Sequence, residues 1–449
     1  MAFAMAPAKS GQDDSTPIFP KHSMAAFLLV TGLFFLWGIP NNLNDVLIRQ
    51  FMKSFEISRL QAGLVQSAFY TGYFCFSIPA ALVMRRFGYK TGLLTGLLLY
   101  SAGTFLFLPA AQARSYSLFL LALFVIASGL GFLETGSNPL IAQMGEPESA
   151  VRRLNFSQAF NPLGSIGGVL IGTLFIFSGI ELKPAEIARM RLAGTYDAYL
   201  QHETMRVIAP YLGLGAVVLI WAFLIFRTPF PAVAVSRSSD SGEPQGKYRD
   251  LFRYPNFLFA VFAQFCYVGA QVGTWSYFIQ YVQDYVHLPE KAAGYFLTGT
   301  LAGFGVGRFT SSWAMKRVHP GTLMGLFAIM NVLLVTVGVL FPGWVGMWAI
   351  FLTSFFMSLM FPTIFALGLR DLGPNTKAGA SLLVMAIIGG AVFTPMIGLV
   401  YQITHSMALA MLVPLVCYIC VGLYAFWGSN LRPHLPTHAW SEVAQDEGR

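Results

Sequence analysis

Charged residues are scarce in this sequence. Asp, Glu, Lys and Arg make up only 11% of its 449 residues, against about 25% in an ordinary soluble domain. Since 55% of the residues are hydrophobic, a soluble chain of this composition would have too few charged groups to cover its surface. The shortage excludes a soluble enzyme, a secreted disulfide scaffold and a nucleic-acid-binding domain. We attribute the net charge of +8 to a bias among loops rather than to an anionic partner.

Cysteine and histidine are also few, and neither forms a chemical site. The four cysteines lie within apolar runs, where we interpret them as small apolar residues of helices, although Cys417 and Cys420 form a C-x-x-C pair. All seven histidines lie in tails, loops or the ends of apolar runs, which excludes histidine as an ion carrier. No His/Cys cluster has metal-ligand spacing and no phosphate-binding loop is present, so neither a metal nor ATP is expected.

Uncharged apolar runs are abundant. Met24–Pro40, Leu118–Leu133 and Met407–Trp427 contain no charged residue. Each reaches or approaches the ~20 residues that cross a ~30 Å hydrocarbon core as a helix. We therefore predict an all-α polytopic membrane protein. Its twelve expected spans lie near 24–52, 60–84, 91–110, 117–143, 155–178, 207–227, 255–284, 291–315, 321–341, 345–369, 378–402 and 406–427.

The spans divide into two sets of six. Residues 228–254 are rich in proline and polar residues and read as a cytoplasmic linker between an N-terminal half, 24–227, and a C-terminal half, 255–427. The tails, 1–23 and 428–449, are also expected in the cytoplasm. Between spans five and six, Ile180–Arg206 is longer than a turn, and we expect a short amphipathic helix there, outside the membrane.

The positions of Lys and Arg predict the orientation. With both termini inside, 18 of these residues fall on the inner side and 9 on the outer side, and Arg308 lies within a span. The positive-inside rule therefore places both termini in the cytoplasm.

The two halves are weakly similar at a nearly constant offset. Trp37-Gly38 matches Val268-Gly269, 231 residues later, and Ile166-Gly167-Gly168 matches Ile388-Gly389-Gly390, 222 residues later. Parallel six-helix repeats with a site between them are the architecture of major facilitator transporters. We therefore predict the major facilitator fold.

Only two of the 20 acidic residues, Asp45 and Glu134, lie well inside predicted spans. A carboxylate at the centre of a membrane helix costs about 2.5–3.5 kcal/mol, so it usually marks an ion or substrate path. Protonation removes this cost, which makes both acids candidate proton carriers. We expect Asp45 to take up a proton from outside and Glu134 to link protonation to substrate binding. The alternative is a buried ion pair, with Arg308 as the strongest candidate partner.

Amides and tryptophans recur at helical spacing around these acids. Trp37, Asn41 and Asp45 are four residues apart and share a helix face, as do Glu134 and Asn138. Amides and carboxylates hydrogen-bond sugar hydroxyls, and an indole ring stacks on the apolar face of a sugar. The alternative for each amide is a contact that joins two helices. The predicted sugar-binding residues are Trp37, Asn41, Asn42, Glu134, Asn138, Gln158, Asn161, Gln264, Tyr267, Gln271 and Trp275.

Three arginines are candidates for structural or gating roles. Arg85 and Arg86 lie in the short inner loop between spans two and three. Arg308 lies near the inner end of span eight, where it is as well placed to brace the cytoplasmic gate as to pair with an acid.

Six segments carry a resemblance to a known family. They are FFLWGIPNNLND (34–45), QAGLVQSAFYTGYF (61–74), GLGFLETGSNPL (129–140), AQFCYVGAQ (263–271), LTGTL with GRFT (297–301 and 307–310) and FPTIFALGLRDLG (361–373). They resemble the fucose–galactose–glucose:proton symporter family of the major facilitator superfamily, over about Phe34 to Pro414.

The resemblance implies proton-coupled import of L-fucose or a related hexose by alternating access. It also implies a monomer in the lipid bilayer of a bacterial inner membrane. The family's two essential acids correspond to Asp45 and Glu134. Its cavity residues correspond to Trp37, Asn42, Gln158, Asn161 and Trp275.

Two short segments depart from the family pattern. Met360-Phe361 stands where Gln-Tyr is expected, and Val272-Gly273-Thr274 also differs. Loss of an amide and a tyrosine hydroxyl would remove sugar contacts if these groups face the cavity. L-fucose, galactose, glucose and other hexoses therefore stay open as substrates.

Other functions also remain open at this stage. Carboxylates and amides bind Na⁺ as well as protons, so a sodium-coupled hexose transporter is an alternative. A drug:proton antiporter would have a more apolar cavity with fewer amides. A sugar sensor that does not transport would need a signalling domain, and the inner loops and tails are short.

Overall fold

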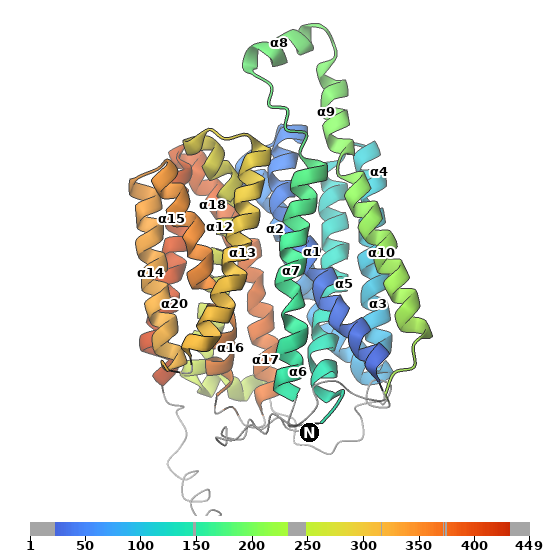
Figure 1. The fold of residues 1–449 in the computed structure, drawn as a ribbon, viewed down its shortest axis with the longest axis vertical. Coiled ribbons are helices and arrows are strands. Elements are labelled where there is room, and N and C mark those ends of the chain that lie inside the picture. The colour runs from blue at the N-terminus through green and yellow to red at the C-terminus, as the bar shows by residue number, and fades with distance from the viewer. Residues whose placement is uncertain are drawn as a thin grey trace, which may run out of the picture.

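The computed structural model describes residues 23–146, 150–231, 248–315, 317–370, 372 and 375–431. Within this part of the chain, eleven helices or helical stretches are long and apolar enough to cross a membrane. Helix α13 (Glu290–Ala314, 25 residues) is less apolar but has the length of a span, and it stands among the others in the bundle (Figure 1). The fold is the predicted all-α membrane bundle.

The helices of the N-terminal half are α1 (Met24–Phe55), α2 (Arg59–Phe87), α3 (Tyr89–Phe105), α4 (Phe107–Gln112), α5 (Tyr116–Gln143), α6 (Ala150–Gln158), α7 (Phe160–Ile171), η2 (Gly172–Ile176), α8 (Pro184–Leu192), α9 (Tyr196–Met205) and α10 (Ile208–Arg227). Those of the C-terminal half, preceded by η4 (Tyr248–Arg253), are α12 (Pro255–Val286), α13, α14 (Pro320–Leu340), α15 (Trp344–Met357), α16 (Met360–Leu369), α17 (Thr376–Met385), η6 (Ala386–Ile388), α18 (Gly389–Thr404), α19 (Met407–Ala410), α20 (Leu412–Phe426) and η7 (Gly428–Asn430).

Four of the spans are broken just before a proline. Proline has no N–H to donate, and its ring clashes with the carbonyl four residues earlier, so a helix tends to stop there. The α6–α7 break lies between the predicted sugar-binding residues Gln158 and Asn161. The α15–α16 break follows Met357, whose carbonyl accepts a hydrogen bond from Tyr267. The last helical residue and the proline are Phe105 and Pro109, Gln158 and Pro162, Met357 and Pro362, and Ala410 and Pro414.

The two halves use the same kind of close helix contact. A Cβ atom on Gly164 of α7 would collide with the carbonyl oxygen of Phe35 on α1. In the C-terminal half, a Cβ atom on Gly389 of α18 would collide with the carbonyl oxygen of Phe265 on α12. Only glycine lets two helix backbones approach this closely. The recurrence is what two similar six-helix repeats would produce.

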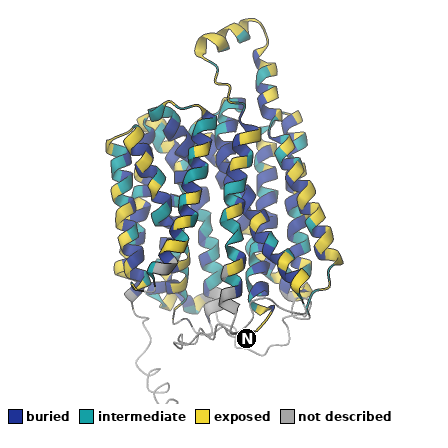
Figure 2. Ribbon diagram, in the orientation of Figure 1, coloured by how far each residue is buried: buried dark blue, intermediate teal, exposed yellow. Residues whose placement is uncertain are grey.

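The outer surface of the bundle is apolar. Large hydrophobic side chains such as Leu28, Phe223 and Phe309 are more than half exposed, and exposed residues face outward around the helices while buried residues face the interior (Figure 2). Apolar side chains on the outside of long helices are the pattern expected for contact with lipid.

The segment between η2 and α10 projects from one end of the bundle (Figure 1). Where one short helix was expected, the structure has two. Helix α8 has no buried residue, whereas α9 buries Tyr196, Leu200, Glu203 and Thr204 on one side. Helix α1 begins, at Met24, at the opposite end of the bundle (Figure 1). We call the end that carries this segment the α8 end.

Candidate functional site

Asp45 lies on α1 with its side chain only 2% exposed. Its Oδ2 accepts a hydrogen bond from Asn42 Nδ2 (3.1 Å), and its Oδ1 accepts from Gln66 Nε2 (2.9 Å) and from Ser276 Oγ (2.8 Å). Gln66 is on α2, but Ser276 is on α12 of the other half. All three donors are neutral, and Arg308 is not among the described partners of Asp45. The carboxylate therefore lies where the two halves meet, held by hydrogen bonds instead of an ion pair.

Glu134 lies on α5 in a more open setting. Its side chain is partly exposed, and no described hydrogen bond reaches its carboxylate. Its backbone carbonyl accepts from Asn138 Nδ2 (3.1 Å), and Gln158 Nε2 donates to Asn138 Oδ1 (3.2 Å). The amide chain thus joins α5 to the end of α6, at the break before Pro162. The carboxylate itself remains available to a bound molecule.

Asn161, just beyond this break, serves a different contact. Its Nδ2 donates to the carbonyl oxygen of Phe34 on α1 (3.3 Å). On the same helix α1, Asn41 is partly exposed and accepts from the Tyr73 hydroxyl (3.4 Å). Both amides therefore bind neighbouring helices while they keep part of their surface free.

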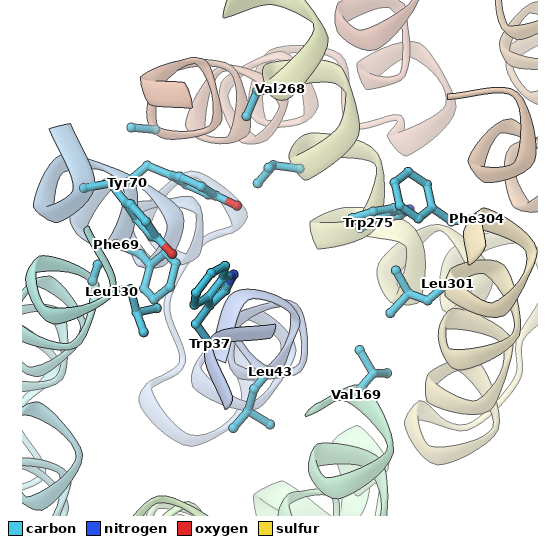
Figure 3. Packing of buried hydrophobic residues seen from close by; sticks show 14 of the residues in the cluster. Trp37, Leu43, Phe69, Tyr70, Leu130, Val169, Val268, Trp275, Leu301 and Phe304 are labelled. Carbon is cyan, nitrogen blue, oxygen red and sulfur yellow. The ribbon is translucent and has the colours of Figure 1, made fainter. Parts of the chain in front are cut away.

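The two tryptophans of the site belong to different halves. The ring of Trp37 on α1 packs on Phe34 with centroids 4.3 Å apart, and it lies beside Tyr70 of α2 (Figure 3). Trp275 on α12 contacts the ring of Phe304 edge to face at 5.2 Å, and its Nε1 donates to Ser354 Oγ (2.9 Å). These contacts hold both indole rings in defined orientations.

The remaining predicted residues of α12 differ in their surroundings. Gln271 is partly exposed. Tyr267 is fully buried and donates its hydroxyl to the carbonyl of Met357 (3.0 Å), within the C-terminal half. Gln264 is also fully buried, and neither atom of its amide has a described hydrogen-bond partner. Of these three, Gln271 is the one with free surface.

Two of the candidate gating arginines have described contacts with aromatic rings. Arg308 places its guanidinium 5.1 Å from the centroid of Phe304. Arg86 is exposed and lies 5.3 Å from the ring of Phe87. The side chain of Arg85 lies outside the described part of the structure. Within that part, no group of three or more His, Cys, Asp and Glu residues could hold a metal ion.

Charged residues join the two halves at the α8 end. Arg59 of α2 and Asp284 of α12 form a bidentate ion pair with N–O distances of 2.6 and 2.7 Å. The guanidinium of Arg59 also lies 3.8 Å from the ring centroid of Tyr401 on α18. The α8 ends of the two halves are therefore in contact in this structure.

A second cross-half cluster surrounds Glu290 of α13, which is fully buried. Glu290 pairs with Lys53 (3.0 Å) and lies 3.7 Å from Arg49, both on α1. Lys53 also binds Glu203 of α9 (3.2 Å), which is 1% exposed, and the Ile180 carbonyl (2.6 Å). The sequence places these acids outside the middle of the predicted spans and predicts no role for them. Their position in the chain did not indicate that they would be buried together.

The sequence indicated Asn42 but not the other two donors to Asp45. Gln66 lies in a quoted segment of α2, and Ser276 directly follows Trp275, but neither stands at helical spacing from an acid. Only the packing of α1 between α2 and α12 brings them to the carboxylate.

Comparisons with known proteins agree with this architecture. The sequence profile of the Major Facilitator Superfamily matches residues 23–395. The L-fucose-proton symporter of Escherichia coli (strain K12) is 41% identical over 409 residues, which cover 90% of this chain and 93% of that protein. The glucose/galactose transporter of Brucella abortus is 33% identical over 407 residues, covering 90% and 94%.

Solved structures show the same relationship. The crystal structure of FucP in the outward conformation has a TM-score of 0.68 at 39% identity and covers 90% of this chain and 99% of that one. The D-xylose-proton symporter has a TM-score of 0.68 at 13% identity and so shares the fold alone. The chain belongs to the major facilitator superfamily, in the family that includes the L-fucose-proton symporters.

Proposed function

We propose that this protein imports a monosaccharide together with a proton by alternating access, as a transporter and not an enzyme. The observation that carries the proposal is Asp45, a buried carboxylate at the boundary between the halves with only neutral donors around it. A buried acid without a cationic partner can lose its charge by protonation more readily than one in an ion pair. Relatives that are 41% and 35% identical are L-fucose-proton symporters.

The sugar site lies between the halves, near Glu134. The free Glu134 carboxylate and the linked amides of Asn138 and Gln158 offer acceptors and donors to hydroxyl groups. Trp37 and Trp275, one on each half, offer flat apolar surfaces. A sugar that contacts both halves would bind more tightly to one arrangement of the halves than to another. Alternating access requires such a difference in affinity.

The energy source is the proton gradient. One proton that moves down a potential of 100 mV supplies about 2.3 kcal/mol, enough for about 40-fold accumulation of sugar. The proton acts here as the coupling ion, and no other cofactor is needed.

The protein acts as a monomer in the bacterial inner membrane, with both termini in the cytoplasm. The excess of Lys and Arg on the side of the termini supports this orientation. The α8 end then faces outward, and the cross-half ion pairs of Arg59 and Lys53 close the outer entrance. In this conformation the site is shut off from the outside.

The substrate is L-fucose or a related hexose. Met360 is fully buried, and Phe361 is partly exposed with its ring 6.3 Å from that of Tyr267. The buried Met360 offers no surface to a sugar, and Phe361 offers a ring without a hydroxyl, so this pair does not select one hexose. Glucose/galactose transporters are also relatives, at 33% identity, so both kinds of sugar must be compared directly.

A pH-electrode recording tests this function. De-energised, lightly buffered cells that express the protein receive L-fucose, then D-galactose, then D-glucose, in sodium-free medium. Alkalinisation of the medium on addition of one sugar is expected, because each sugar molecule carries a proton into the cell.

The matched control is a strain with Asp45→Asn, which should transport sugar without taking up protons. A flat trace with all three sugars, together with sodium-dependent uptake of a labelled sugar, would contradict proton coupling and favour sodium.

A further inference from the structure

The side chains of Asp45, Gln66 and Ser276 form a closed set of hydrogen bonds inside the bundle. Gln66 Nε2 donates to Asp45 Oδ1 (2.9 Å) and also lies 2.9 Å from Ser276 Oγ, which itself donates to the same Oδ1 (2.8 Å). Gln66 and Ser276 are both fully buried. The triangle of Asp45, Gln66 and Ser276 is therefore closed, and Asn42 takes the other carboxylate oxygen.

This triangle suits the ionised form of Asp45. An ionised carboxylate only accepts hydrogen bonds, and here it accepts three. Each hydrogen bond to the charged carboxylate favours the ionised form by about 10- to 100-fold. The Ser276 hydroxyl can also rotate and accept a hydrogen bond from a protonated Asp45, whereas an alanine could do neither.

Ser276 reaches Asp45 from the opposite half. Along α12, Tyr277 donates to the Arg59 carbonyl (2.7 Å) and Asp284 pairs with the Arg59 guanidinium. Ser276 begins this series, and the contacts continue from it toward the α8 end. Separation of the two halves at the α8 end would move α12 away from α1 and α2, and Asp45 would lose this donor while keeping Gln66 and Asn42, which belong to its own half.

We propose that Ser276 is a positioning residue that makes proton release from Asp45 depend on closure of the α8 end, with Gln66 holding the Ser276 hydroxyl in place. Closure brings the Ser276 hydroxyl to the carboxylate and stabilises its charged form. The proton therefore leaves after the outer entrance has shut. The inference rests on the proposed proton symport, and it adds a residue and an order of events to it.

Few described groups other than Ser276 can influence the charge state of Asp45. Among the described side chains, the hydrogen-bond partners of Asp45 are the neutral Asn42, Gln66 and Ser276, and the titratable neighbour of Asp45 is Tyr70 of α2. Asp45 is therefore hydrogen-bonded to α2 through Gln66 and to α12 through Ser276.

Infrared difference spectroscopy of the purified protein in lipid tests the proposal without any sugar. The C=O stretching band of protonated Asp45 is identified by its loss in Asp45→Asn and followed while the pH is stepped. In Ser276→Ala the pH of half-maximal band intensity is expected to move by about one unit to the alkaline side, because the ionised carboxylate has lost a donor. Ser276→Thr, which keeps a hydroxyl, is expected to restore the wild-type value.

Ser67→Ala is the matched control. Ser67 also makes a cross-half hydrogen bond, to the Ala391 carbonyl (2.7 Å), but touches no acid. Its band should stay at the wild-type pH. An Asp45 band that titrates but does not move in Ser276→Ala would overturn the role of Ser276 alone. If the wild-type protein shows no titrating band that is lost in Asp45→Asn, Asp45 does not carry a proton. That result would overturn the proposed proton symport and this inference with it.

Transport in proteoliposomes gives a second readout, with labelled L-fucose and D-galactose as the probes. Net proton-driven uptake requires proton release, whereas exchange of internal for external sugar does not. Ser276→Ala is expected to lower net uptake about tenfold and to leave exchange within about twofold. Equal losses in both assays would indicate a merely structural role.

Discussion

At the scale of single residues, the Asp45→Asn substitution separates transport from coupling. The amide keeps the size of the side chain but has no proton to exchange. We expect loss of sugar accumulation driven by a pH gradient, with counterflow of labelled sugar retained. The measurement is labelled uptake into proteoliposomes with and without an imposed gradient. Full accumulation in the variant would show that Asp45 is not the proton carrier.

Glu134 is expected to act on sugar affinity. No described hydrogen bond reaches its carboxylate, and the side chain is partly exposed, so the carboxylate is free to accept hydrogen bonds from sugar hydroxyls. Glu134→Gln replaces a charged acceptor by a neutral one, and loss of one charge-assisted hydrogen bond weakens binding by about 10- to 100-fold.

Sugar binding can be followed for Glu134→Gln by quenching of tryptophan fluorescence. The control is Gln201→Ala. Gln201 lies on α9, which holds none of the predicted sugar-binding residues, and donates to the Ala111 carbonyl. An unchanged affinity in Glu134→Gln would remove Glu134 from the sugar site.

At the scale of elements, the packing of α18 on α12 depends on glycine. A methyl group at Gly389 would collide with the backbone carbonyl of Phe265, and backbone cannot move aside as a side chain can. Gly389→Ala is therefore expected to destabilise the protein by about 1–3 kcal/mol, seen as a lower Tm in detergent.

Gly303 of α13 provides the control for Gly389. A Cβ atom there would meet nothing within 4 Å. Since alanine favours a helix over glycine by up to about 1 kcal/mol, Gly303→Ala should leave the Tm unchanged or raise it. Equal effects of the two substitutions would mean that the close contact of α18 with α12 does not limit stability.

At the scale of the whole molecule, the buried Glu290 cluster holds the α8 end closed. Removing one partner of a buried ion pair costs about 3–5 kcal/mol because the other charge stays buried and unpaired. Glu290→Gln leaves Lys53 with fewer partners in the closed form only, so the equilibrium is expected to move toward the form that is open at the α8 end.

Electron–electron distance measurements between spin labels can detect this opening. Labels at Ala113 and Phe341, both exposed, report the separation of the halves once the exposed Cys75 has been replaced. The distance distribution should shift to longer values in Glu290→Gln. Arg191→Gln breaks an exposed pair with Glu56 inside one half and should leave the distribution unchanged; a shift there as well would mean that the effect of Glu290 is not specific.

Much of this protein was determined by the sequence itself, because the forces involved act along the chain. Hydropathy is a local property, so apolar runs predicted the spans, and the proline positions account for where four of them break. The cost of burying a charge in lipid singled out Asp45 and Glu134 from 20 acids. The family resemblance then connected these residues to sugar transport.

The tertiary structure decided what depends on the contact of distant segments. Ser276 meets Asp45 across 231 positions of sequence, and no periodicity within one helix contains that information. Glu290 and Glu203 looked like loop acids near the ends of spans, yet they are buried because helices from two halves close over them. Packing of the whole bundle decides which helices face one another. The proposed link between the charge of Asp45 and closure of the α8 end therefore depends on the tertiary structure.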